Sequence, residues 1–131
     1  MKHKDFRKAI GIIDFEEIEA MISTLEEDLT SFETTCKSLL EETKKMSVEQ
    51  FKKILLKHKE LRLKYKSLIE KQDEIVNRIF LGKRLNDDDH QKVRFYKRRI
   101  KELKPRLIDL GSYIATLRKE NPELVSVTLT S

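Results

Sequence analysis

Apolar residues between positions 15 and 39 recur at alternating intervals of three and four. The series is Phe15, Ile18, Ile22, Leu25, Leu29, Phe32, Cys36 and Leu39. This spacing places every member on one narrow stripe of an α-helix, whereas a strand would alternate at every second residue. Asp14 followed by Glu17 has the spacing of an N-cap with an acid at the third helical position. The pattern predicts a first helix over about 15-46.

A second stripe opens in a new register after residue 46. Ser47 and Gln50 have the spacing of a capping box, which satisfies two backbone N–H groups at a helix start. The stripe consists of Phe51, Ile54, His58, Leu61, Tyr65, Leu68, Gln72, Ile75 and Ile79. It is widened by three further apolar residues, Leu55, Ile69 and Val76. A wide apolar face contacts two neighbours, so we expect a central helix over 48-81, capped by Gly82.

A third stripe follows a short polar connection. Its members are Val93, Tyr96, Ile100, Leu103, Leu107, Leu110, Ile114 and Leu117. Three successive aspartates at 87–89 supply a cap and a negatively charged first turn, which the helix dipole favours. Pro105 lacks a backbone donor and is expected to kink the helix, and Gly111 weakens it slightly. The pattern predicts a third helix over 87-119.

The three stripes together predict an all-α fold. Short connections between helices of about 32 residues force neighbours to run antiparallel, which gives three long antiparallel helices in an up-down-up coiled-coil-like bundle. We expect residues 1-131 to form this single helical-bundle domain, with residues 1-13 as an N-terminal arm and 122-131 as a flexible C-terminal tail. Alternating valines and threonines leave a second interpretation of the tail, a strand donated to a partner. Long heptad stripes can also be completed between chains, so a homo-oligomer is an open alternative.

Composition narrows the class of protein. Charged residues make up 39% of the chain, against three glycines and two prolines, as in long solvated helices. Cys36 is the only cysteine, so no intramolecular disulfide can form and a reducing compartment is expected. No window approaches the roughly 20 apolar residues of a membrane span, and the basic N-terminus lacks a secretory apolar core. We therefore expect a soluble cytoplasmic protein with no membrane span.

The net charge of +5 is divided unevenly along the chain. Residues 14–46 hold ten acids and three bases, whereas residues 82–121 hold twelve bases and six acids. In the heptad frame one acidic row faces one basic row across the first and third helices: Glu19, Glu26 and Glu33 face Lys92, Arg99 and Arg106. A second basic row on the middle helix faces two acids of the first: Lys57, Lys64, Lys71 and Arg78 face Asp28 and Glu42. Such rows specify which helices are neighbours more than they stabilise the fold.

Five bases of the third helix have no assigned acid and form the candidate binding surface: Arg94, Lys97, Arg98, Lys101 and Lys104. An ordinary solvated face explains such a run, but so does a surface for an acidic protein partner or for phosphates. We expect no exposed aromatic residues among these bases and find no nucleic-acid-binding motif. The leading hypothesis is a protein-protein interaction module, an adaptor or accessory subunit. The alternative is a nucleic-acid-binding accessory protein that contacts backbone phosphates.

Two residue clusters raise the question of chemistry. Cys36 and His58 should share a core layer with Leu107, where a thiol beside an imidazole could be a nucleophile. Core packing is the favoured interpretation, because a narrow three-helix seam leaves little room for a pocket. The acids before His90 could be imagined as metal ligands, but helix capping explains them without a metal. We expect no catalytic residues, no cofactor and no metal, and hence a protein that is not an enzyme.

Overall fold

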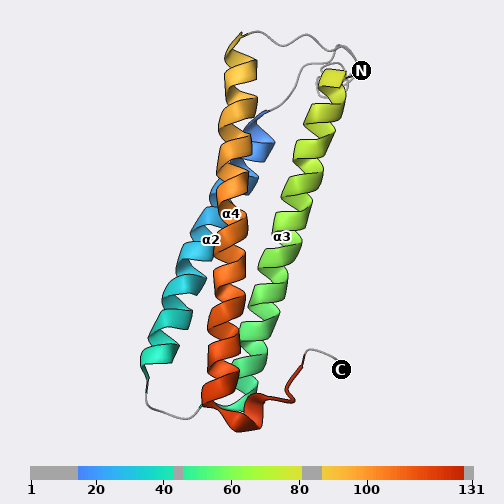
Figure 1. The fold of residues 1–131 in the computed structure, drawn as a ribbon. Coiled ribbons are helices and arrows are strands. Elements are labelled where there is room, and N and C mark those ends of the chain that lie inside the picture. The colour runs from blue at the N-terminus through green and yellow to red at the C-terminus, as the bar shows by residue number, and fades with distance from the viewer. Residues whose placement is uncertain (1–14, 43–45, 81–86, 129–131) are drawn as a thin grey trace.

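The computed structural model describes residues 15–42, 46–80 and 87–128. In this part of the chain three long helices are followed by a short 3-10 helix (Figure 1): α2 (Phe15–Glu41), α3 (Val48–Phe80), α4 (Asp87–Glu120) and η1 (Pro122–Leu124). The predicted all-α class of three long helices is confirmed. The second and third helices match the predicted bounds to within one residue.

The helices alternate in direction, as the colours in Figure 1 show: α3 runs opposite to α2 and α4. Ion pairs between α2 and α4 agree with this arrangement. Glu19 and Glu33 of α2 pair with Arg99 and Arg106 of α4 in the same rising order, so these two helices are parallel. The bundle is therefore up-down-up.

The three predicted stripes form the core. Buried members come from α2 (Ile18, Ile22, Leu25, Leu29, Phe32, Cys36), from α3 (Phe51, Ile54, Leu61, Leu68, Ile75) and from α4 (Ile100, Leu103, Leu107, Leu110, Ile114, Leu117). Each aliphatic or aromatic side chain stabilises the fold by roughly 1.5–3 kcal/mol on burial. Among the described residues, no polar or charged side chain is fully buried. His58 and Gln72, the polar members of the α3 stripe, are half-buried.

The first helix is shorter than the sequence predicts. α2 ends at Glu41 instead of Met46. Positions 42–45 are all polar, so continuing the helix would bury nothing more. Met46 itself is buried in the core, and its backbone N–H donates to the side-chain oxygen of Asn121 at 3.4 Å. Met46, just before α3, is thus held at the end of α4.

The start of α3 has the predicted capping box. The backbone N–H of Ser47 donates to the Gln50 side-chain oxygen, and the Gln50 N–H donates to the Ser47 hydroxyl, each at 3.1 Å. α4 begins with the three aspartates and continues through Pro105 as one helix. The predicted caps at Asp14 and Gly82 and the N-terminal arm lie outside the described residues.

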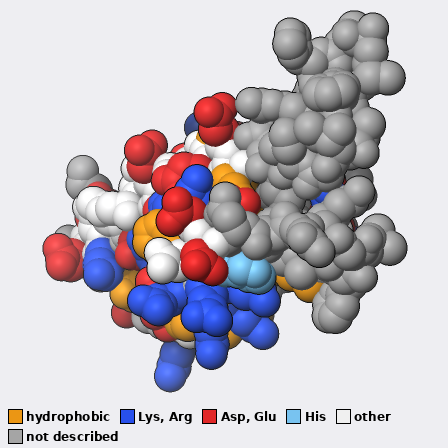
Figure 2. Space-filling view, turned by 90° about the horizontal axis from the view of Figure 1, so that it is seen from above, with side chains coloured by type: hydrophobic (Ala, Val, Ile, Leu, Met, Phe, Trp, Pro, Cys, Tyr) orange, Lys and Arg blue, Asp and Glu red, His pale blue; other side chains and the backbone are white. Residues whose placement is uncertain are grey.

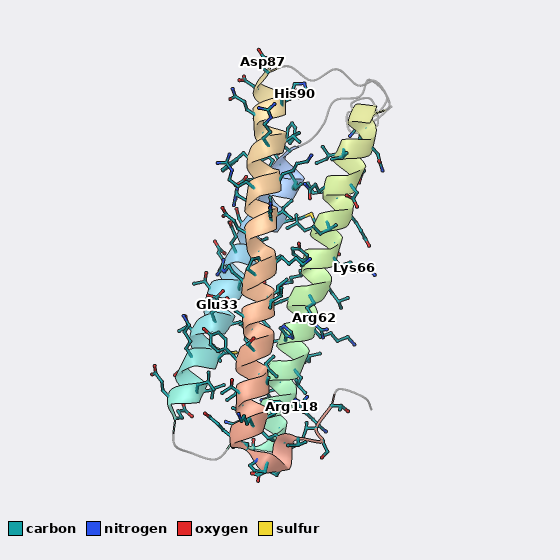
Figure 3. The ribbon with its side chains drawn as sticks, in the orientation of Figure 1. Glu33, Arg62, Lys66, Asp87, His90 and Arg118 are labelled. Carbon is teal, nitrogen blue, oxygen red and sulfur yellow. The ribbon has the colours of Figure 1, made fainter. Side chains whose placement is uncertain are left out.

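The segment after α4, for which the sequence predicts a flexible tail, lies against the end of the bundle. Leu124 is fully buried and Val127 is half-buried against the core. Arg118 donates to the backbone carbonyls of Leu124 at 2.8 Å, Val125 at 3.3 Å and Val127 at 2.7 Å. A single arginine, labelled in Figure 3, thus holds several residues of this segment at defined positions.

Candidate binding surface on α3 and α4

Ion pairs close the seam between α2 and α4. Arg99 donates to both carboxylate oxygens of Glu19, at 2.8 and 3.0 Å, and to Glu26 at 2.5 Å. Arg106 donates to Glu33 at 2.7 Å. The hydrogen bonds from Arg99 hold the pKa of Glu19 below its ordinary value. The predicted meeting of these acidic and basic rows is confirmed for Arg99 and Arg106.

The third base of that row behaves differently. The ammonium group of Lys92 lies 5.5 Å from the centre of the Phe15 ring. Arg99 contacts both Glu19 and Glu26 because a guanidinium offers five donors in a planar fork. Two bases therefore contact all three acids of the row.

The seam between α2 and α3 carries two ion pairs. Lys64 pairs with Asp28 at 2.6 Å, as the heptad frame predicts, and Lys71 pairs with Glu17 at 2.8 Å. The hydrogen bond from Lys64 lowers the pKa of Asp28, and the bond to Glu17 raises the pKa of Lys71. These contacts and those of Arg99 and Arg106 together engage most of the acids of α2 that face a neighbouring helix.

All five bases of the predicted surface are exposed: Arg94, Lys97, Arg98, Lys101 and Lys104. Within the described residues, no acid forms an ion pair with any of them. Two exposed acids lie in the same stretch of α4: Glu102 is one turn from both Arg98 and Arg106, and Asp109 follows Arg106 by one turn. Figure 2, seen from the end at which α4 begins, shows Lys and Arg side chains gathered on one side of the molecule.

The structure adds three exposed bases of α3 to this surface: Lys59, Arg62 and Lys66. His58 identifies the edge of α3 that faces α4, because its ring nitrogen Nε2 lies 3.4 Å from the Leu107 carbonyl of α4. Arg62 follows His58 by one turn and Lys66 follows Arg62 by one turn, and both are labelled on α3 in Figure 3. The described residues include no ion-pair partner for these three bases.

Lys97 lies on the side of α4 that faces α3, where it lines a small crevice together with Gln72 and Val76 of α3. Lys101 and Lys104 follow one and two turns later along the same side. We call the eight bases that border the α3–α4 seam and the outer side of α4 the basic face. They are Lys59, Arg62, Lys66, Arg94, Lys97, Arg98, Lys101 and Lys104.

Two exposed apolar residues lie beside the basic face. Ile108 is 60% exposed and follows Lys104 by one turn, at the end of the stripe that Lys97 begins. Phe95 is 51% exposed, and its ring lies 5.4 Å from the Arg99 guanidinium. The expectation that no exposed aromatic residue lies among the bases is therefore wrong. Phe95 occupies the border between the basic face and the α2 seam, where hydrophobic spacing does not determine exposure.

The residues considered for chemistry are packed between the helices or lie in the first turn of α4. Cys36 is fully buried, and burial raises the pKa of its thiol to about 11. Burial also lowers the pKa of His58. Its contact with Leu107 shows that His58 and Leu107 share a layer, as predicted. Asp87 and His90 lie in the first turn of α4 (Figure 3). The described residues contain no cluster of three metal-ligating side chains.

A hollow of about 440 Å³ lies between α2 and α3, lined by Ala20, Met21, Thr24, Leu63, Lys64 and Ser67. Its lining is mainly apolar, and Lys64 is its sole titratable member. Lys64 is held in its ion pair with Asp28, and the lining contributes no acid of its own that a catalytic pair would require. In the described part of the chain, none of the helices has the length and apolarity needed to cross a membrane.

Comparison with protein-family models, with the sequences of curated proteins and with solved structures found no match to this chain.

Proposed function

We propose that this chain is a non-enzymatic protein-protein interaction module, a helical rod that binds an acidic protein partner through its basic face. Such a rod would act as an adaptor or as an accessory subunit of a larger assembly. One observation carries the proposal: eight exposed bases from two helices border one surface, and no described acid pairs with them. Acids of α2 that face the neighbouring helices are engaged instead with Arg99, Arg106, Lys64 and Lys71.

Concentrated positive charge favours a partner of opposite charge. A single exposed ion pair contributes little free energy, because solvent and salt screen it. A row of complementary charges has a larger effect, because it accelerates association with the partner and sets the orientation of the complex. The basic face is therefore suited to select an acidic surface, and apolar contacts at its edge would add affinity.

Ile108 favours a protein over a nucleic acid as that partner. A phosphate backbone offers nothing to cover a 60% exposed isoleucine in line with Lys97, Lys101 and Lys104. Protein interfaces, in contrast, combine an apolar centre with a polar rim. An acidic protein can satisfy both the bases and Ile108.

A second candidate function, nucleic-acid binding through backbone phosphates, rests on Phe95. This half-exposed aromatic ring lies beside Arg94 and Arg98, and aromatic rings among bases are used to stack on nucleobases. One face of the ring is already occupied by Arg99. Phosphate binding would show itself by a steep loss of affinity with salt.

Three features support a function without catalysis. Cys36 is buried with a raised thiol pKa, which disfavours the reactive thiolate. The lining of the hollow between α2 and α3 includes no acid, and the described acids and histidine at the start of α4 form no metal cluster. A single buried thiol also suits the reducing cytoplasm, in which we place this interaction.

The decisive experiment reverses charge on the basic face. The variant Lys97→Glu, Lys101→Glu, Lys104→Glu is compared with a control of equal charge change, Lys37→Glu, Lys53→Glu, Lys119→Glu, whose exposed positions lie elsewhere. Proteins bound from a nuclease-treated extract of the source cells are crosslinked and identified, and light scattering after size exclusion measures complexes with added nucleic acid at two salt concentrations.

We expect the wild type and the control to crosslink an acidic protein through the basic face, and the test variant to lose it. Capture of the same partners by both variants would reject the proposal. A salt-sensitive complex with nucleic acid that the test variant alone loses would establish the second candidate instead.

A further inference from the structure

We infer that the partner contacts this protein through an acidic amphipathic helix, which lies along the α3–α4 seam as a fourth helix of the bundle. Its acids face the bases that border the seam, and its apolar residues cover Ile108. The inference rests on the proposed function and specifies the partner's chemistry and shape.

The first argument is the spacing of the exposed stripe on α4. Its members are separated by four, three and four residues: Lys97, Lys101, Lys104 and Ile108. These intervals repeat the heptad spacing of the core stripes on a different side of the helix. Eleven residues of helix extend about 16.5 Å, so the stripe offers four contacts at steps of about 5.5 Å.

A second helix repeats its own side chains at that same step. Acids at intervals of three and four on a partner helix therefore stay in register with all four positions of the stripe. An extended chain places same-side residues about 6.7 Å apart, which amounts to about 20 Å over three steps. At the last position the extended chain is therefore displaced from the stripe by about 3.5 Å. The spacing of the stripe thus favours a helical partner over an extended one.

The second argument is the composition of the seam on α3. A second charged border runs along α3, where bases again recur at intervals of three and four: Lys59, Arg62 and Lys66. Leu55 and Ile69, one heptad to either side of Arg62, are half-buried against the core. Together with Ile108 they offer apolar contacts between two charged borders. Helices of a four-helix bundle pack over this combination of an apolar line with charged flanks.

The third argument compares the three seams. Arg99 and Arg106 bridge the α2–α4 seam, and Lys64 and Lys71 bridge the α2–α3 seam with acids of α2. Across the α3–α4 seam, none of the eight bases of the basic face forms an ion pair with a described acid. Bases border it from both helices, so an acidic surface of another chain would complement this seam and neither of the other two.

The test uses three synthetic peptides of about 18 residues, five helical turns. The first places glutamates and leucines at intervals of three and four on one helical face, the second has the same composition in rearranged order, and the third is polyglutamate. Binding to the full chain is measured by fluorescence anisotropy at low salt, and helix formation by circular dichroism.

We expect the patterned peptide to bind about tenfold more tightly than the rearranged one and to become helical on binding. Ile108→Ser should weaken its binding about tenfold, whereas Leu63→Ser should leave it unchanged. Leu63 is a matched control, since it is 53% exposed on the α2 side of α3. Both substitutions are at exposed positions, and thermal unfolding confirms that each variant is folded.

Equal binding of the patterned and rearranged peptides, or an unchanged affinity for Ile108→Ser, would overturn the helix inference. Either result would leave the proposed function standing if the triple charge reversal still abolished capture of an acidic protein. Loss of that capture difference would instead reject the proposed function itself. The two failures are therefore distinguishable.

Discussion

The Arg118 guanidinium lies 4.8 Å from the centre of the Phe51 ring while it donates hydrogen bonds to the backbone carbonyls of Leu124, at the end of η1, and of Val127. Phe51 is fully buried near the start of α3, and Arg118 belongs to the last turn of α4. One side chain therefore connects two helix ends and the C-terminal segment. The charge remains compatible with its surroundings because carbonyl oxygens and the ring face all attract a cation.

Replacing Arg118 should release the C-terminal segment. We expect Arg118→Ala to lower the free energy of unfolding by about 1–3 kcal/mol, because the partly buried carbonyls of Leu124 and Val127 lose their donor and the Phe51 ring loses its cation. Urea denaturation measures this, and hydrogen exchange should show faster exchange at residues 124–128. The exposed neighbour provides the control: Lys119→Ala should change neither. Unchanged exchange in Arg118→Ala would show that burial of Leu124 holds the segment alone.

Gly111 is a site at which a larger residue should stabilise the protein. A methyl group added there meets only the Cε1 atom of His58, at an ordinary contact distance of 3.9 Å. Alanine in a helix interior is favoured over glycine by about 0.5–1 kcal/mol. Gly111→Ala should raise the free energy of unfolding by that amount, and the β-branched Gly111→Val should gain less. A loss of stability in the alanine variant would show that the His58 ring needs the empty space.

The Arg99 ion pairs predict a dependence of stability on pH. Arg99 holds the pKa of Glu19 below its ordinary value of 4.5, so their attraction stabilises the folded state at neutral pH. That contribution is lost as the pH falls through the lowered pKa and Glu19 becomes protonated. Arg99→Met should therefore cost about 1 kcal/mol at neutral pH, a modest value because both carboxylates are partly exposed, and little in strong acid.

The matched control for this titration is Arg98→Met, an exposed position with no acid partner among the described residues. Chemical denaturation across the acidic range compares the wild type with both variants. Parallel acid profiles for the wild type and Arg99→Met would mean that this network does not contribute to acid sensitivity.

Cys36 should be inert in the folded protein. Its sulfur is buried and the thiol pKa is raised to about 11, first by burial and then by the negative charge of Glu33. Since thiol reagents attack the thiolate, labelling at neutral pH should proceed only as fast as the protein unfolds. Addition of denaturant should make it rapid. Fast labelling of protein with unchanged circular dichroism would revive the nucleophile hypothesis for Cys36.

The core was predictable because apolar spacing and helix geometry specify the same stripe. From Ile18 to Cys36 every third or fourth residue is buried, and the pattern alone identifies these positions. The capping box at Ser47 was equally readable, since its two bonds depend only on residues three apart. The apolar stripe of a helix and its capping box depend on residues close together in the sequence, so they are specified independently of how the helices pack.

Features that depend on how the helices are arranged were less accessible. The α4 half of the basic face follows from the charge run, but assigning Lys59, Arg62 and Lys66 to it requires knowing which edge of α3 faces α4. Three antiparallel helices can be arranged in two handed ways around the same core stripes, and heptad spacing does not distinguish them. Leu124 was missed for a related reason. A single apolar residue after a helix carries no periodicity, so only the position of Arg118 reveals its burial.

The parallel pairing of α2 with α4 has a consequence for the order of assembly. The acids that pair with Arg99 lie 73 and 80 residues earlier in the chain. The α2–α4 ion pairs can therefore form only after α4 has been synthesised. Synthesis proceeds at about 5–20 residues per second, and the 34 residues of α4 therefore take about 2–7 s to appear. Throughout that interval the nascent hairpin of α2 and α3 exposes its leucines and isoleucines. We therefore expect the nascent protein to pass through a two-helix intermediate with exposed apolar surface. Such an intermediate is open to chaperone binding and to aggregation until α4 completes the bundle.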